Sequence, residues 1–242
     1  MYKRKTYHFE NCYEVEEYHN GRYGAPGEPR VKIRKATKEQ IKKRNQYNKE
    51  KRLRRKLRKN FKKNDYWLTL TYTKDNRPEE MKKATKDVTS FLNKLRRYYK
   101  KQGQELKWVL HTEVGSRGGT HHHLVLNRIQ DGDIAIRKCW VKGGVHIDLL
   151  YEEGGFKKLA NYLAKVPDEK NKMKNSRYSC SRNLITPEPE VKIMKRKTWK
   201  EEPKPRKGYY LEKESYFEGI NPVTRHKYRY YTMVRVRRID DG

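Results

Sequence analysis

The stretch from Trp108 to Asn127 constrains the fold of this chain more than any other segment, and it reads WVLHTEVGSRGGTHHHLVLN. Two apolar runs flank the Gly-rich segment 115–119, which predicts two β-strands joined by a tight turn. Side chains alternate between the two faces of a strand, so His121 and His123 point to one face and His122 to the other. We expect His122 to pack, or to support its neighbours through a hydrogen bond.

The predicted hairpin brings further polar side chains to the face of the two outer histidines. With the turn centred near Arg117, antiparallel pairing places Glu113 opposite His121 and His111 opposite His123. One carboxylate with two or three imidazoles on rigid strands suits a divalent ion that polarises a phosphate oxygen. The alternative is a merely solubilising face of a half-exposed hairpin. We favour the metal site, with Glu113, His121 and His123 as its ligands.

Length and charge limit the kind of protein and partner. The 242 residues suffice for one sizeable α/β domain with appendages. A net charge of +31, from 61 Lys plus Arg against 30 Asp plus Glu, indicates a polyanionic partner, with nucleic acid first. No apolar run is long enough to span a bilayer, and no membrane partner is expected. Three widely separated cysteines indicate neither a disulfide framework nor a zinc cluster, so we expect a reducing cytoplasm.

The N-terminal segment 1–63 contains a strongly basic helix. Residues 37–40 have capping-box spacing, which predicts a helix over 38–61 with sparse apolar positions. So many like charges would be stabilised by an anionic partner, whereas the alternative is a solvated surface helix. The DNA-binding candidates on this helix are Arg52, Arg54, Arg55 and Arg58.

The middle of the chain, 64–185, alternates strands and helices. Residues 67–72 and 145–151 are predicted strands that enclose the hairpin, and helices are predicted over 79–101, 133–141 and 155–166. This order predicts an α+β, ferredoxin-like split βαβ fold. Its antiparallel sheet would carry helices on one face and the metal site on the other, open face.

The C-terminal segment 186–242 is expected to end in a β-hairpin. Residues 209–217 and 227–237 read as two strands around the Asn221-Pro222 turn. The hairpin would be either an appendage or an extension of the central sheet.

A candidate nucleophile stands on the predicted helix 155–166. Tyr162 and Lys165 are three residues apart and share one side of a helix, so both can reach one reacting centre. A phenol beside a cation and a metal-bound phosphate is a usable nucleophile. The YxxK spacing alone is weak among 19 tyrosines and 61 basic residues.

Taken in order, three motifs resemble those of the HUH endonucleases, which include the rolling-circle replication initiators of plasmids, phages and integrative elements. Leu68-Thr-Leu-Thr-Tyr72 looks like their first motif, His121-His-His123 like the His-hydrophobe-His motif, and Tyr162-Leu-Ala-Lys165 like the nucleophile motif. The resemblance covers about residues 64–185. It departs from the family in having His122 where an apolar residue is usual. Lys158 and Val166, four residues either side of Tyr162, exclude the paired-tyrosine arrangement.

The resemblance implies a metal-dependent endonuclease that nicks single-stranded or extruded origin DNA. Tyr162 would form a 5′-phosphotyrosine link and release a 3′-hydroxyl, with assistance from Lys165. Glu113, His121 and His123 would hold Mg or Mn, and His111 would be a fourth ligand or a supporting group. A host helicase and a host polymerase are the implied partners.

Two other functions are compatible with the same residues. An HUH single-strand transposase or a relaxase would use the same catalytic set, although length and the basic helix favour replication. A non-catalytic nucleic-acid-binding protein would keep the histidines as a remnant, and a metal-dependent nick distinguishes it.

Overall fold

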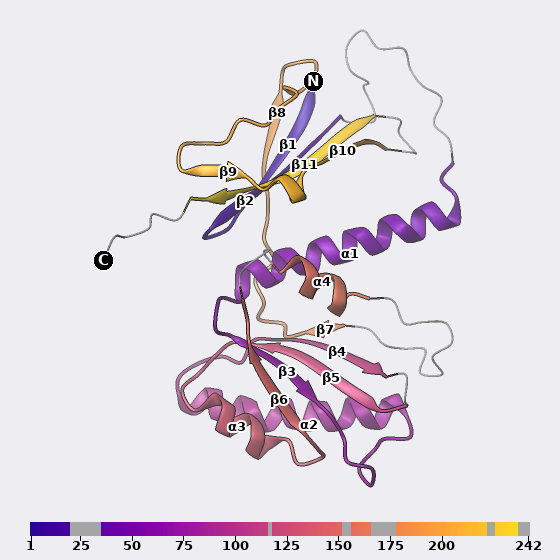
Figure 1. The fold of residues 1–242 in the computed structure, drawn as a ribbon, viewed down its shortest axis with the longest axis vertical. Helices are drawn as coiled ribbons and strands as arrows, with labels where there is room; N and C mark the ends of the chain where they lie inside the picture. The colour runs from indigo at the N-terminus through magenta and orange to yellow at the C-terminus, as the bar shows by residue number, and fades with distance from the viewer. Residues whose placement is uncertain (20–34, 116–117, 152–155, 166–177, 222–225, 237–242) are drawn as a thin grey trace. The chain divides into compact units, whose positions relative to one another are not determined.

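The computed structural model describes residues 1–19, 35–115, 118–151, 156–165, 178–221 and 226–236 (Figure 1). The chain forms two compact units. The central unit is Arg44–Thr186, and the terminal unit combines Met1–Lys43 with Pro187–Gly242. This division differs from the three successive segments expected from the sequence, because strands from both ends of the chain share one sheet.

The central unit is built on a five-stranded antiparallel sheet of order β6-β3-β5-β4-β7. Its strands are β3 (Tyr66–Leu70), β4 (Trp108–Val114), β5 (Thr120–Leu126), β6 (Val145–Leu149) and β7 (Ser179–Cys180). Helix α2 (Met81–Lys101) connects β3 to β4, and β5 lies between these two strands. This split βαβ arrangement confirms the predicted α+β, ferredoxin-like fold.

One face of the central sheet packs against α2 and α3 (Gly132–Cys139). The apolar stripe predicted for α2 is buried there, with Val88 and Leu95 at 1% and 0% exposure. Leu68 and Leu124 face this stripe from the sheet and are fully buried. This layer is the larger core of the central unit, and it holds the strands in register.

The other face of the central sheet is not open, which corrects the sequence-based expectation. Helices α1 (Lys38–Asn60) and α4 (Lys157–Leu163) both contribute to a second core on this face. Leu53 and Leu57 of α1 are fully buried in this core together with Val125 of β5. The sparse apolar residues of the basic helix, four positions apart, form the stripe that covers the sheet. α4 packs beside it and carries Tyr162.

The terminal unit is a second, six-stranded sheet of order β10-β11-β2-β1-β8, in which β9 also pairs with β11. Its strands are β1 (Tyr2–His8), β2 (Cys12–Tyr18), β8 (Glu190–Met194), β9 (Tyr209–Leu211), β10 (Phe217–Ile220) and β11 (Lys227–Arg235). A 3-10 helix, η1, spans Lys213–Ser215. The C-terminal strands therefore extend the N-terminal β1/β2 pair, so they are neither a separate hairpin nor part of the central sheet.

Two expectations about composition can be compared with the described part of the chain. None of its helices is both long enough and apolar enough to cross a membrane. Cys12, Cys139 and Cys180 are all free thiols.

Candidate active site

The β4/β5 hairpin has the register predicted from the sequence. Glu113 pairs with His121 and His111 pairs with His123. The Gly115 N–H donates to the Gly119 carbonyl at 2.8 Å and closes the turn. Arg117, the predicted centre of this turn, lies outside the described residues. The hairpin therefore brings the carboxylate and the outer imidazoles to one face of the sheet.

Helix α4 places the Tyr162 hydroxyl on this face. The phenol oxygen lies 2.8 Å from Glu113 Oε1 and 2.8 Å from His123 Nε2. The same two acceptors are 3.2 Å apart, so phenol, carboxylate and imidazole form a closed triangle. Residues from two separate parts of the sequence, predicted independently as ligands and nucleophile, thus meet at one point.

His111 completes the cluster from the middle of β4. Its Nε2 lies 3.7 Å from Glu113 Oε2, and the residue is 2% exposed. His111 and then His123 lower the pKa of Glu113 well below its ordinary value, so the carboxylate is ionised and accepts hydrogen bonds.

The Tyr162 phenol is held in its protonated form. Burial, and next the hydrogen bond and the charge of Glu113, raise the pKa of Tyr162 above its ordinary value. A neutral phenol is a weak nucleophile, so attack by this oxygen requires a group that takes its proton and a cation that stabilises negative charge. Glu113 and His123 are placed for the first task.

His123 is supported by two residues of β3 that the sequence reasoning missed. The Thr69 hydroxyl is hydrogen-bonded to His123 Nδ1 at 3.2 Å, and the Trp67 ring is stacked on the imidazole with 5.6 Å between centroids. Thr69 also pairs with His123 in the β3/β5 register. The alternation of faces along Leu68-Thr-Leu-Thr-Tyr72 could have identified Thr69 as a neighbour of this site.

Two predicted site residues lie apart from the Tyr162 triangle. The His121 ring lies over the turn, where a β-carbon added at Gly119 would be 3.2 Å from His121 Nε2. Lys165 is exposed and follows the end of α4, so it does not share a helical face with Tyr162 as predicted. Within the described residues, no contact links the Lys165 ammonium to the phenol.

The C-terminal end of α4 is fixed by α1. The Gln46 side-chain amide and the Lys49 ammonium both donate to the Ala164 carbonyl, at 2.9 and 3.0 Å. A cation at a helix C-terminus is favourable because the last carbonyls carry partial negative charge. No local sequence pattern connects these residues, which lie more than 100 positions apart.

His122 lies on the opposite face of β5, as predicted. The residue is fully buried, and its Nε2 and Nδ1 are each 2.8 Å from a hydroxyl, those of Tyr72 and Thr112 respectively. Burial lowers the pKa of His122 to about 3, so the ring is neutral. Its surroundings indicate a structural role.

We expect His122→Ala to destabilise the protein by about 2–4 kcal/mol, because a buried ring is removed and two buried hydroxyls lose their partner. Urea unfolding followed by circular dichroism measures this loss. The matched control is His146→Ala, whose imidazole is 73% exposed and whose removal should change stability by less than about 0.5 kcal/mol. Equal effects of the two substitutions would contradict the structural role.

The four arginines predicted to contact DNA differ in exposure. Arg52 is exposed, and Arg54 and Arg58 are half-buried. Arg55 does not fit the prediction, because it is 5% exposed and shares the buried side of α1 with Leu53. A buried guanidinium cannot reach a phosphate in solvent.

The metal ligands expected from the sequence can be compared with this geometry. Within the described part of the chain, no group of three or more His, Cys, Asp or Glu residues is arranged to hold a metal ion. The donor chemistry nevertheless fits a divalent ion, because an ionised carboxylate is flanked by imidazole nitrogens at 3.2 and 3.7 Å. His111 Nδ1 is buried without a hydrogen-bond partner.

Comparison with known proteins agrees with the motifs. Residues 65–167 match the family model of the replication-associated protein ORF2. This segment runs from the start of β3 to just beyond α4 and contains the whole Tyr162 cluster. Searches of curated proteins and of solved structures found no match. The match confirms the resemblance and is consistent with a rolling-circle Rep protein, whose family has a role in replication.

Proposed function

We propose that the protein initiates rolling-circle replication by nicking single-stranded origin DNA with Tyr162 as the nucleophile. The observation that carries this proposal is the Tyr162 hydroxyl at 2.8 Å from both Glu113 and His123. A purely structural tyrosine needs no ionised carboxylate and imidazole at its hydroxyl, whereas a nucleophile needs groups that accept its proton.

The reaction is a transfer of a phosphoryl group from one oxygen to another. The phenol oxygen forms a bond to phosphorus while the bond from phosphorus to the upstream 3′ oxygen breaks. The phenol proton passes to Glu113 or His123, and the leaving 3′ oxygen takes up a proton to become the free 3′-hydroxyl. The product is a 5′-phosphotyrosine link at Tyr162, and the 3′-hydroxyl can prime synthesis.

A divalent ion, Mg or Mn, would be held by Glu113 and His123, with His121 as the further predicted ligand and His111 close enough to take part. The ion supplies Lewis-acid polarisation of the scissile phosphate and stabilises developing negative charge. Thr69 and Trp67 keep the His123 ring oriented, and the Gln46 and Lys49 contacts keep α4 against the sheet. Lys165 is proposed to contact the phosphate once DNA is bound.

A direct test incubates the protein with a pool of single-stranded oligonucleotides and Mn, and then separates the products on a denaturing SDS gel. We expect an SDS-resistant protein–DNA band, together with a shorter DNA product that ends in a 3′-hydroxyl. EDTA should remove both products. Absence of any covalent band with either Mg or Mn would contradict the proposal and favour a non-catalytic binder.

DNA contact by α1 is a separate part of the proposal. Replacing Arg52, Arg54 and Arg58 by Gln should weaken binding to unrelated single-stranded sequences, because phosphate contacts carry little sequence information. Removal of each arginine–phosphate contact should reduce the slope of log affinity against log salt by about one unit. Fluorescence anisotropy over a range of NaCl concentrations measures this slope.

The control for the α1 arginines removes the same number of charges from the helix on the opposite face of the sheet. Lys82, Lys83 and Lys86 of α2 are all exposed and suit this purpose. The lysine variant should keep the salt slope close to that of the unaltered protein. An unchanged slope in the arginine variant would exclude α1 from the interface.

A further inference from the structure

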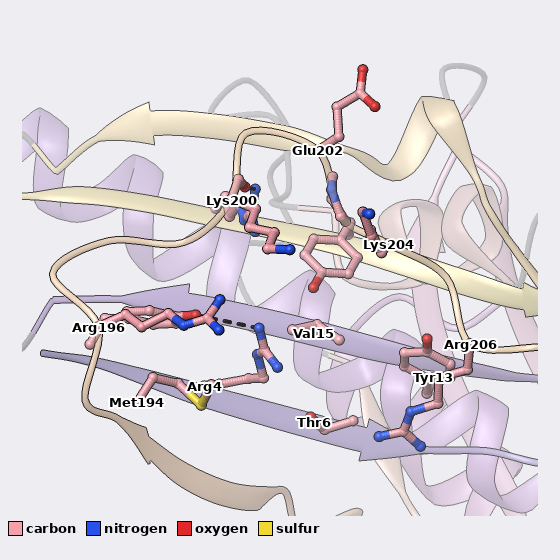
Figure 2. A pocket seen from close by; sticks show the side chains of 14 residues that line it. Arg4, Thr6, Tyr13, Val15, Met194, Arg196, Lys200, Glu202, Lys204 and Arg206 are labelled. Carbon is pink, nitrogen blue, oxygen red and sulfur yellow. Dashed lines mark hydrogen bonds between the residues drawn. The ribbon is translucent and has the colours of Figure 1, made fainter.

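The terminal unit contains a pocket of about 410 Å³, far along the sequence from the Tyr162 motif. Its floor is formed by strands β1, β2 and β11, and its roof by the segment between β8 and β9 (Figure 2). Figure 2 shows Lys200 and Lys204 of this roof above Arg4 and Val15 of the floor. The volume lies within the range of small-molecule sites, roughly 300–1,000 Å³.

The floor of the pocket has an excess of positive charge. Glu17 is fully buried and is shared by two guanidiniums, with Arg4 Nε at 2.7 Å and Arg229 Nε at 2.6 Å from its two oxygens. One carboxylate between two arginines leaves a net charge of +1 largely withdrawn from water. Such a charge is unfavourable unless an anion balances it.

The roof is fastened to this floor by the same buried arginine. Arg229 Nη1 donates to the Lys200 and Glu201 carbonyls at 2.6 and 3.0 Å. Trp199, which is 6% exposed, lies against the Arg229 guanidinium and donates its indole N–H to Glu218 at 3.1 Å. The pocket is therefore bounded by a roof with specific anchors and is not merely a space under a passing loop.

The rim adds further cations without matching carboxylates. Six basic side chains and one acidic side chain line the pocket among the described residues. The acidic one is Glu202, whose carboxylate points away from the others in Figure 2. Four of the cations have no carboxylate within ion-pair distance in the described part of the chain, and these are Arg196, Lys200, Lys204 and Arg206. Strong charge of one sign at a concave site attracts a multiply charged anion.

The remaining wall suits a flat ring. Tyr2, Tyr13 and Tyr231 line the pocket beside apolar Val15 and Met194. Phenol rings offer apolar edges and hydroxyl groups, and an arginine already lies over one of them, with Arg206 4.9 Å from the Tyr13 centroid. Planar groups are therefore already accommodated at this wall.

We propose that this pocket binds a nucleotide, with its phosphate against Arg4 and the rim cations and its base against the tyrosines. The chemistry is that of one nucleotide unit of single-stranded DNA, and a free nucleotide shares it. This inference does not depend on the proposed nick, because no residue of the pocket belongs to the Tyr162 site. It would give the protein a DNA contact independent of catalysis.

The test uses full-length protein, EDTA and single-stranded DNA that contains bromodeoxyuridine, which forms crosslinks to nearby aromatic residues under ultraviolet light. Mass spectrometry should place crosslinks in peptides that contain Tyr2, Tyr13 or Tyr231. A variant with Arg196, Lys204 and Arg206 replaced by Gln should lose at least about nine-tenths of them. These residues are exposed, so thermal unfolding of the variant should match that of the unaltered protein.

The matched control replaces Lys195, Lys197 and Lys207 by Gln, which removes three charges from the same segment but outside the pocket lining. This control should keep the crosslinks. An equal loss of crosslinks in both variants, or their absence from all three tyrosine peptides, would overturn the proposal whatever the outcome of the nicking assay.

Competition distinguishes the sources of the ligand. Loss of the crosslinks on addition of dTMP, but not of inorganic phosphate at equal concentration, supports a site that also takes free nucleotides. Crosslinks that resist both competitors, but not unlabelled single-stranded DNA, support a site for a nucleotide within a strand. Equal displacement by inorganic phosphate and dTMP would overturn the nucleotide assignment and indicate a plain anion site.

Discussion

Tyr162→Phe is expected to abolish the covalent DNA adduct while the fold and the DNA affinity persist. The substitution removes one oxygen, the atom that lies 2.8 Å from Glu113 and from His123, and it keeps the ring that packs between Trp67 and the imidazoles. Without that oxygen no phosphotyrosine can form, so the SDS-resistant band should fall below detection. Circular dichroism and fluorescence anisotropy should show an intact protein that still binds single-stranded DNA.

Two other tyrosines provide matched controls for this variant. Tyr151 is 75% exposed and follows β6, and the Tyr178 ring lies 5.2 Å from the Lys49 ammonium. Tyr151→Phe and Tyr178→Phe should both keep the adduct. An adduct that survives in Tyr162→Phe, or that disappears in either control, would assign the nucleophile elsewhere.

Glu113→Gln and His123→Ala are each expected to remove metal-dependent nicking. Glu113→Gln preserves shape but loses the charge that accepts the phenol proton and favours a cation. Substitutions of residues that only support a ligand reduce metal affinity or activity by about 10–100-fold, so loss of a ligand should exceed that range. Titration calorimetry with Mn and the denaturing-gel assay measure the two effects separately. His121→Ala is predicted to behave in the same way.

The controls for these substitutions are Glu79→Gln and His146→Ala, which alter an exposed carboxylate and an exposed imidazole of the central unit. Both should leave Mn binding and nicking unchanged. Full activity in Glu113→Gln would exclude the carboxylate as ligand and as proton acceptor.

The parts of the fold that could be predicted are those with a local pattern. The β4/β5 register follows from a Gly-rich turn and the alternation of side chains, so the pairs of Glu113 with His121 and His111 with His123 were predictable. The split βαβ order follows from helical and strand periods taken in sequence. The position of His122 behind the site follows from the same alternation.

The parts that could not be predicted depend on contacts between distant segments. Leu53 and Leu57 appear isolated within a basic helix, and only the assembled sheet shows that they cover its second face. The contacts of Gln46 and Lys49 with Ala164 and the sharing of Glu17 by Arg4 and Arg229 likewise join residues far apart in sequence. Charged residues buried on β2 and β11 also obscure the strand alternation that would have revealed the terminal sheet.

Peptide mapping of the trapped adduct tests the central claim most directly. The protein is incubated with single-stranded DNA and Mn, the adduct is isolated under denaturing conditions, and both DNA and protein are digested before mass spectrometry. We predict a nucleotide attached through its 5′ phosphate to the peptide that contains Tyr162, and no such peptide when EDTA is present. A nucleotide attached to a peptide that lacks Tyr162 would contradict the account.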